Sequence, residues 1–341
     1  MLDYRAVDAS FFATHLDGYL PEEVFDCHVH LGVPEQFDPI SAERKQEMWA
    51  LEVGQTLRAE TLGDLGAHLF PQRRTRWVAF AMPIRECHLD QANDYVAAAR
   101  RAGHIHAAFL VTDPAWSAAE LRDRVQAGSF AGLKPYPDLV RDRPSGEAGI
   151  PEFLPPAHLG VAAEERLAIM LHLPRAERLR DPRNIAELRQ AATESPTVPI
   201  IVAHIGRAYT MSFAAGQLER LADLPNLHFD FAANLNADVI ELALRTVGPR
   251  RVLYGSDLPI VLMHGRRDHV GDRYINYTDG DYSWNTNRRP PAVEANYTLF
   301  LYEQLRAFRE AAERVGLARR DVARVMGGNM SSLLSTDRLR P

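Results

Sequence analysis

Eight short runs rich in apolar and β-branched residues recur along this 341-residue chain, and their even spacing is the strongest constraint on its fold. Turn residues and then a segment with helical spacing of apolar residues follow each run, a pattern that predicts alternating strands and helices. The repeat averages about 33 residues, a length typical of βα units. The predicted strands are Val24–His30, Arg76–Pro83, Ile105–Thr112, Phe130–Tyr136, Leu167–Leu173, Pro199–Ile205, Leu227–Ala233 and Val252–Leu258.

Eight βα units in one chain predict an α/β protein with a (β/α)8 TIM barrel, in a single domain over residues 1–341. The alternative, two doubly wound domains, needs a linker, and the nearest candidate is the Pro/Gly-rich segment 143–160. Because this segment directly follows strand four, we interpret it as an insertion in a loop at the active face. We also expect an insertion after strand one, at 33–72, and a long polar loop after strand eight, at 264–291.

Ionisable residues gather at the carboxyl ends of the predicted strands. Side chains alternate along a strand, so Asp26, His28 and His30 face the barrel interior while Phe25 and Cys27 face the helices. Near the ends of four other apolar runs, shortly before a Gly or Pro, stand Lys134, His172, His204 and Asp257.

This set of side chains predicts a metal site. A single histidine at a strand end is commonly an ordinary polar residue, but histidines and an aspartate at the same rim of four strands favour a shared ion. Neutral imidazoles and a carboxylate suit Zn2+ or another borderline divalent ion. Water bound to such an ion becomes a nucleophile near neutral pH, and a neighbouring His or Asp moves its proton. Asp230, on strand seven, is a candidate to support this site from the interior.

Lys134 is informative because the chain has only one other lysine, Lys45, against 37 arginines. Alternation directs Lys134 and Tyr136 into the barrel. A cation beside a divalent ion must be neutralised, paired or bound to an anion. Three outcomes stay open: a carbamate bridging two ions, a salt link to Asp26 or Asp257, or contact with a substrate carboxylate. We favour substrate contact or ion pairing.

Six motifs resemble the amidohydrolase-related branch of the amidohydrolase superfamily: DCHVH, GLKPYP, MLHLP, IVAHIGR, LYGSDLP and VARVMGGNMSSLL. They span the chain from the first strand to the last helix. The resemblance implies a metal-dependent barrel in which His28, His30 and His172 bind the ion. It also implies that Asp257 is a ligand or proton shuttle, and that His204 binds a second ion or polarises the substrate.

The same family contains hydrolases of amides and lactones as well as non-oxidative decarboxylases and hydratases. We expect a hydrolase in which metal-activated water attacks an amide, lactone or related carbonyl of a small, carboxylate-bearing molecule. Zn2+ is the expected cofactor, with Mn2+ as the alternative, and Asp257 and His204 are the expected catalytic residues. The alternative is a lyase that decarboxylates or hydrates an aromatic or unsaturated acid. A barrel with a purely structural metal is disfavoured, because structural zinc sites are closed and cysteine-rich.

Substrate contacts are expected from basic and aromatic residues near the strand ends. The candidates are Lys134, Tyr136, Arg207, Tyr282 and Trp284, with Arg85 and Arg175 as weaker ones. Because the loop after strand eight carries four aromatic residues, we expect it to act as a lid or as a contact in a homodimer; these residues are Tyr274, Tyr277, Tyr282 and Trp284.

The net charge of the chain limits the classes of partner that we expect it to bind. A net charge of −6 and an isoelectric point near 6.1 argue against nucleic acid or an anionic membrane, and favour a small-molecule substrate. No stretch approaches the roughly 20 apolar residues of a membrane span, and the N-terminus lacks a signal-peptide pattern. With only two cysteines, Cys27 and Cys87, we expect reduced thiols and a cytoplasmic protein.

Overall fold

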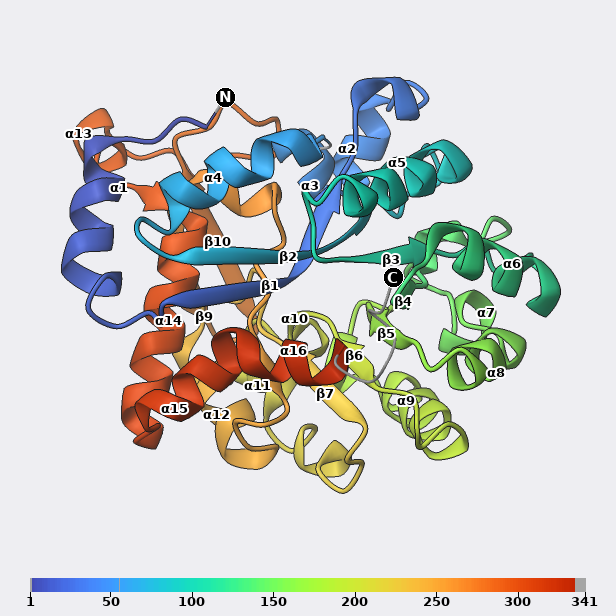
Figure 1. Ribbon diagram of the computed structural model, residues 1–341. Coiled ribbons are helices and arrows are strands. Elements are labelled where there is room, and N and C mark those ends of the chain that lie inside the picture. The colour runs from blue at the N-terminus through green and yellow to red at the C-terminus, as the bar shows by residue number, and fades with distance from the viewer. Residues whose placement is uncertain (1, 55, 335–341) are drawn as a thin grey trace.

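Eight parallel strands form one sheet in the order of the sequence, and helices alternate with them. The computed structural model describes residues 2–54 and 56–334. The strands are β1 (Glu23–Leu31), β2 (Arg74–Ala81), β3 (Ala107–Val111), β4 (Gly132–Lys134), β5 (Ala168–Leu171), β6 (Ile200–Val202), β7 (Leu227–Asp230) and β8 (Val252–Leu253). This is the expected (β/α)8 barrel (Figure 1).

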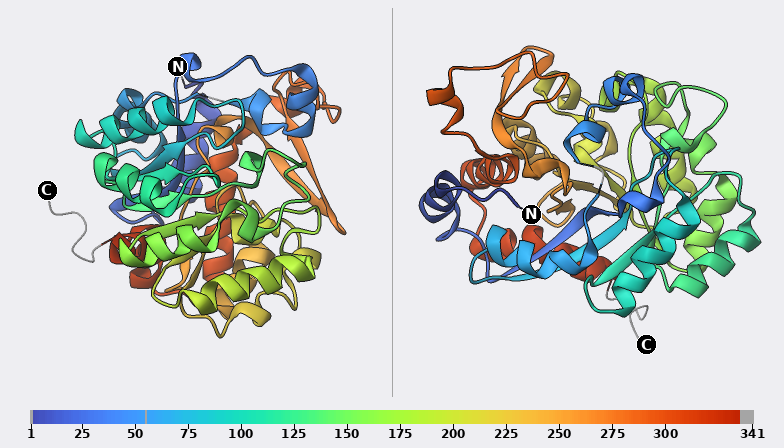
Figure 2. Two further views of the ribbon diagram at one scale, coloured as in Figure 1. Left: turned by 90° about the vertical axis from the view of Figure 1, so that its right-hand side faces the viewer. Right: turned by 90° about the horizontal axis from the view of Figure 1, so that it is seen from above.

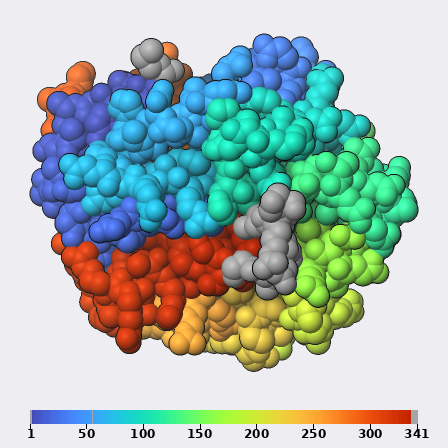
Figure 3. Space-filling view, viewed as in Figure 1, coloured from blue at the N-terminus to red at the C-terminus, as the bar shows by residue number. Residues whose placement is uncertain are grey.

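Strand β1 and the segment that directly follows β8 close the barrel through backbone hydrogen bonds. Cys27 N donates to Tyr254 O at 3.0 Å, and His30 N donates to Leu258 O at 2.8 Å. In the space-filling view the blue N-terminal segments accordingly lie against the red C-terminal helices (Figure 3). Closure places the carboxyl end of β1, with its two histidines, beside the segment that carries Asp257.

Seven longer helices pack around the outside of the strands, because each has an apolar stripe that faces the sheet. They are α4 (Leu62–Leu69), α5 (Leu89–Arg101), α6 (Ala118–Gly128), α8 (Pro156–Glu164), α9 (Pro182–Glu194), α12 (Ala237–Thr246) and α14 (Phe300–Val315). Their ends follow capping chemistry: Asp181 accepts from the first amides of α9, and Gly316, at φ 74°, ends α14. Strands β3, β5 and β6 are buried along their whole length, as expected inside such a shell.

Shorter helices occupy the connections. They are α1 (Ala6–Phe11), α2 (Ala42–Glu47), α3 (Ala50–Val53), α7 (Ile150–Phe153), α10 (His204–Arg207), α11 (Met211–Ala214), α13 (Pro291–Glu294), α15 (Arg319–Ala323) and α16 (Asn329–Leu334). The insertion after β1 contains α2 and α3, and that after β4 contains α7. The expected single domain over 1–341 includes residues 1, 55 and 335–341, which lie outside the described residues.

The segment after β8 is a small sheet, so the expectation of a long loop was wrong. Strands β9 (His264–Val270) and β10 (Arg273–Thr278) form a hairpin, and β11 (Thr298–Leu299) pairs with β9 (Figure 2). The hairpin has a two-residue turn with Gly271, at φ 56°, in its first position, which is favourable turn chemistry. The sequence contains this hairpin signal, a Gly-Asp pair between two runs that form strands. The runs were not recognised as strands because most of their residues are polar.

Several predicted strands extend beyond the strands of the structure. The prediction continued β6 to residue 205 and β8 to residue 258, whereas they end at Val202 and Leu253. The chain turns sharply there, since His204 and Asp257 have left-handed backbones with φ of 58° and 75°. No helix in the described parts of the chain combines the length and the apolar character needed to span a membrane.

Candidate active site

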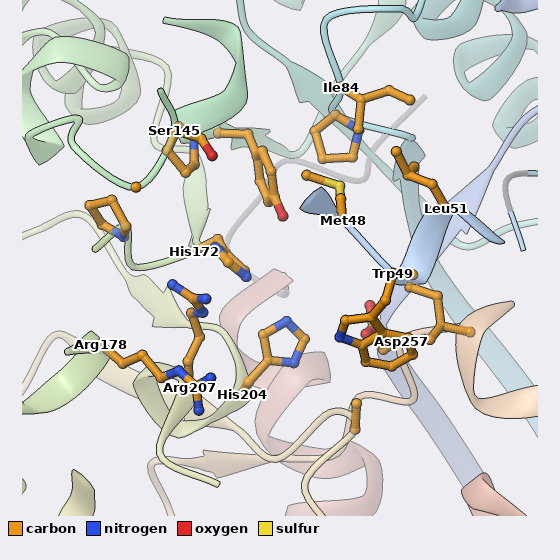
Figure 4. Close-up of a pocket in the computed structure, with 18 of the residues that line it drawn as sticks. Met48, Trp49, Leu51, Ile84, Ser145, His172, Arg178, His204, Arg207 and Asp257 are labelled. Atoms are coloured by element: carbon orange, nitrogen blue, oxygen red, sulfur yellow. The ribbon is translucent and has the colours of Figure 1, made fainter. Parts of the chain in front are cut away.

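A cavity of about 470 Å³ opens at the carboxyl ends of the barrel strands (Figure 4). This volume lies within the range of small-molecule sites, and this is the face where barrel enzymes place their chemistry. Side chains from β1 and β4, the loops after β5, β6 and β8, the β1 insertion and the β9–β10 hairpin line it. The ionisable ones are His28, His30, Glu47, Lys134, Tyr136, His172, Arg175, Arg178, His204, Arg207, Tyr209, Asp257, Arg267 and Tyr274.

His28, His30 and Asp257 come together at the floor of this cavity. The Oδ1 atom of Asp257 lies 3.2 Å from His30 Nε2 and 3.4 Å from His28 Nε2. One potential ligand atom from each of the three residues lies within 4.8 Å of the others. These residues can therefore hold a metal ion, as the spacing of the two histidines and the rim position of Asp257 predicted.

Asp230 holds this floor in place from beneath. Its Oδ2 lies 3.0 Å from His28 Nδ1, and its Oδ1 accepts from the backbone amides of His204 and Ala232 at 2.8 and 3.0 Å. With Nδ1 bound to a carboxylate, His28 turns Nε2 toward the cavity as a free lone pair. His28, His204 and Asp230 form a second group of potential ligands, in which His28 and Asp230 already bond to each other.

His204 and His172 stand on the other side of the floor. The ring of His204 lies 4.9 Å from that of His28 and 5.4 Å from that of His172, measured between centroids. His204 Nδ1 lies 2.8 Å from Ala232 O, so the neutral ring keeps its proton there and leaves Nε2 unprotonated. His172 belongs to neither group of potential ligands, so its place on the ion stays a prediction.

The donor set fits a divalent cation. Burial lowers the pKa of His28, His30 and His172, and the Lys134 or Arg207 cation nearby lowers it further, so these imidazoles are neutral as ligands must be. The buried Nδ1 atoms of His30 and His172 have no hydrogen-bond partner. Burial alone raises the pKa of Asp257, but the electrostatic influence of the nearby His204 imidazole and the hydrogen bond with His30 hold it below its usual value.

Strained backbone concentrates around the cavity. Ten described non-glycine residues have positive φ, and six of them line this one site: Arg175, Arg178, His204, Arg207, Ala233 and Asp257. Each such conformation costs about 1 kcal/mol or more, and such costs are typical of functional sites. The strain turns these side chains inward from residues that lie just beyond the strands.

Lys134 is buried in the cavity wall without a partner. Its Nζ has no hydrogen bond, and no ion pair joins it to Asp26 or Asp257, both of which the structure describes. The ammonium instead lies 4.7 Å from the ring centre of Phe80 and 5.7 Å from that of Tyr136. Burial lowers the pKa of Lys134 to about 8. The salt-link alternative is therefore not formed, which leaves contact with substrate or carbamylation.

The predicted arginines divide between the cavity and the surface. Arg207 lines the cavity and donates to Leu173 O and Arg175 O, both at 3.1 Å. Arg175 also lines it, whereas Arg85 is bound to Asp138 outside. Sequence reasoning missed two further arginines of the cavity, Arg178 and Arg267, because one sits in a loop and the other in the unrecognised hairpin.

The aromatic candidates also divide. Tyr136 lines the cavity and its ring lies 4.8 Å from that of His172. Tyr282 and Trp284 stack on each other outside the cavity, and Trp284 packs on Trp49, which does line it. Direct contact with a ligand therefore falls to Trp49 of the β1 insertion (Figure 4), whose position Trp284 supports.

Comparison with known proteins identifies the family of this chain. A sequence model of the family described as amidohydrolase matches residues 25–329. The chain belongs to this family. No curated protein matches the sequence of this chain.

Solved structures similar to this amidohydrolase include both hydrolases and carboxy-lyases. An amidohydrolase from Burkholderia multivorans with bound zinc has a TM-score of 0.57 at 13% identity, covering 92% of this chain and 99% of that chain. A 5-carboxyvanillate decarboxylase from Novosphingobium aromaticivorans, complexed with manganese, has 0.58 at 11%, covering 94% and 97%. A probable 2-pyrone-4,6-dicarboxylic acid hydrolase from Acinetobacter baumannii, with citric acid bound, has 0.57 at 13%, covering 92% and 99%. The likeness shows a shared fold.

Replacing Asp230 by asparagine is expected to weaken metal binding about 10- to 100-fold, because partners that orient metal-bound histidines have effects of this size. Metal content after dialysis against a graded series of chelator concentrations measures the change. The exposed Asp64 of α4 provides the control, Asp64→Asn. Unchanged retention in Asp230→Asn would show that His28 does not depend on this carboxylate for its orientation.

Proposed function

We propose that this protein is a metal-dependent hydrolase that acts on an amide, lactone or related carbonyl of a small, carboxylate-bearing molecule. The observation that carries the proposal is the arrangement of Asp257 beside His28 and His30, opposite His204, at the floor of a cavity rich in cations. Side chains for water activation, for proton transfer and for carboxylate binding thus lie within one space.

The resident ion is proposed to be Zn2+, with Mn2+ as the alternative, because imidazole and carboxylate donors suit both. His28, His30 and Asp257 would hold it, with His172 as a further candidate ligand. When bound, such an ion supplies Lewis acidity, which makes water acidic near neutral pH and polarises a carbonyl oxygen.

Asp257 is proposed to move the proton. Its carboxyl is ionised near neutral pH, so it can accept a proton from water and later return it to the leaving group. His204 is proposed to face the substrate oxygen. Its Nδ1–H is held by Ala232 O, so Nε2 is the ring atom left to bond with that oxygen, and it donates to developing negative charge when it carries a proton from solvent.

Lys134 and Arg207 are proposed to bind a substrate carboxylate. Both reach the cavity, and Lys134 in particular has no acidic partner among the described residues. A carboxylate beside Lys134 would neutralise a buried cation, which is the condition under which such a charge is tolerated.

Replacing His204 by asparagine tests the division of roles. If His204 serves the substrate, the variant is expected to keep its metal and to lose turnover through kcat by about 100-fold, with KM little changed. Metal analysis and steady-state kinetics on the same preparation measure both effects. Loss of the metal would instead make His204 a ligand of an essential ion.

Decarboxylation is the second candidate, because the same cations can hold an aromatic or unsaturated acid. One experiment separates the two reactions. The metal-loaded protein is assayed against carboxylated lactones by proton release, against carboxylated amides by release of the amine, and against hydroxybenzoates by release of CO2. We expect hydrolysis of a lactone or an amide without CO2; CO2 from a hydroxybenzoate, without hydrolysis of any lactone or amide, would establish the lyase.

A further inference from the structure

One wall of the cavity carries more arginines than the proposed chemistry uses. Arg178 follows β5, Arg207 follows β6 and Arg267 lies on β9, so three separate segments bring guanidinium groups to this wall. Figure 4 shows Arg178 and Arg207 together, beyond His204 and on the side away from Trp49. Arg175 adds a fourth group, whose buried Nε and Nη2 have no hydrogen-bond partner among the described residues.

Two tyrosines hold Arg178 and Arg267 close to each other. The Cζ of Arg178 lies 5.3 Å from the ring centre of Tyr209 and 5.6 Å from that of Tyr274. The Cζ of Arg267 lies 5.2 and 4.4 Å from the same two rings. Hydrogen bonds to Ala233 O and to Asn276 fix the Arg267 side chain.

These cations lack counter-charges. Within the described residues none of the four arginines forms an ion pair, although many surface arginines of this chain do. The cavity contains only two acidic side chains, and of these Glu47 is already paired with Arg44 while Asp257 lies at the metal floor. Burial lowers the pKa of Arg207 and of Arg267, and repulsion from Arg178 lowers both further.

Clustered and unpaired guanidinium groups that are buried, as Arg267 is, or half-buried, as the other three are, are costly unless an anion joins them. The planar guanidinium group of arginine can also donate two parallel hydrogen bonds to the two oxygens of a carboxylate, a geometry that no other side chain offers as well. One carboxylate at Lys134 and Arg207 would leave Arg178 and Arg267 uncompensated. The cluster therefore requires a second negative group on the same ligand.

We propose that the substrate carries two carboxylates, and that Arg178 and Arg267, positioned by Tyr209 and Tyr274, bind the second one. This inference rests on the proposed function for the first carboxylate alone, since it concerns a second group of the same ligand. It assigns a role to the β9–β10 hairpin: it brings the specificity-determining Arg267 to the barrel mouth.

Calorimetric binding of matched acids to the metal-loaded protein tests the proposal. Benzoate is compared with the three benzenedicarboxylates, and butyrate with succinate and glutarate, so that each pair differs by one carboxylate. At least one dicarboxylate is expected to bind 10-fold or more tightly than its monocarboxylate. In Arg267→Met and Arg178→Met this ratio should fall to near 1, while monocarboxylate affinity stays unchanged.

Arg266→Met is the matched control, because Arg266 is the exposed neighbour on the same strand. Arg267→Lys keeps the charge and should retain part of the preference if Arg267→Met proves unstable. Equal affinity for mono- and dicarboxylates in the unmodified protein would overturn the proposal, as would a preference that survives in both arginine variants. Tighter binding of phenyl phosphate than of every dicarboxylate would overturn the choice of a carboxylate. Binding is read without turnover, so these results are independent of whether the reaction is hydrolysis.

Discussion

Replacing Asp257 by asparagine is expected to lower kcat about 1,000-fold or more while the barrel stays folded. A positioned proton acceptor contributes two to four orders of magnitude, and an amide cannot accept the proton that Asp257 is proposed to take. Asparagine is the right replacement, since the backbone φ of 75° at this residue is one that asparagine tolerates better than most. Kinetics at saturating metal measure the loss.

Metal content must be followed in the same samples, because Asp257 also lies within ligand distance of two histidines. Asp123→Asn, on the exposed face of α6, controls for a change of one surface charge. If Asp257→Asn regains normal turnover once excess metal refills the site, the carboxylate acts only as a ligand. A variant with full metal and normal turnover would contradict both roles.

The fold could be predicted from the sequence because its signal is repeated eight times. Each βα unit has an apolar run followed by an amphipathic segment. An error in the bounds of one unit does not change the predicted number of units, and so it does not change the predicted fold. The cavity floor was also accessible, since His28, His30 and Asp257 are polar residues where apolar ones would otherwise occur. The structure places all three together at the end of the barrel where the strand pattern put them.

The cavity residues that were not predicted lie outside the eight barrel strands. Arg178 and Arg267 stand among many other arginines, so no local pattern marks them, and only tertiary structure brings them to one wall. Trp49, which the sequence did not single out, lines the cavity in place of the expected Trp284 for a similar reason. Composition indicated an aromatic contact, but the direct position in the cavity belongs to the β1 insertion and the supporting position to the segment after β10.

Lys134→Met is expected to make the protein more stable and much less active. A buried lysine whose pKa falls from 10.5 to about 8 opposes folding by about 3 kcal/mol at neutral pH, because each unit corresponds to 1.36 kcal/mol. Methionine has similar length, fills the same space against Phe80 and Tyr136, and carries no charge. Its free energy of unfolding without metal should therefore exceed that of the unmodified protein by up to this amount.

The pH dependence of the free energy of unfolding shows independently whether Lys134 stabilises or destabilises the folded state. The folded pKa of Lys134 lies below the unfolded value, so the folded state holds fewer protons between about pH 8 and 10.5. The penalty is complete below pH 8 and is relieved as the pH rises through that window. Denaturant unfolding of the metal-free proteins at several pH values should show the advantage of Lys134→Met shrinking toward pH 10, with Lys45→Met, the only other lysine, showing no such trend.

If Lys134 binds the substrate, Lys134→Met should stabilise the fold and remove activity. We expect kcat/KM of Lys134→Met to fall at least 100-fold, because the substrate carboxylate loses its buried cation. Lys134→Arg should retain part of the affinity and show its defect chiefly in KM. If Lys134→Met were instead less stable at neutral pH, the ammonium would be part of the structure. Two metal ions per chain with bicarbonate-dependent activity would make this lysine a carbamate ligand.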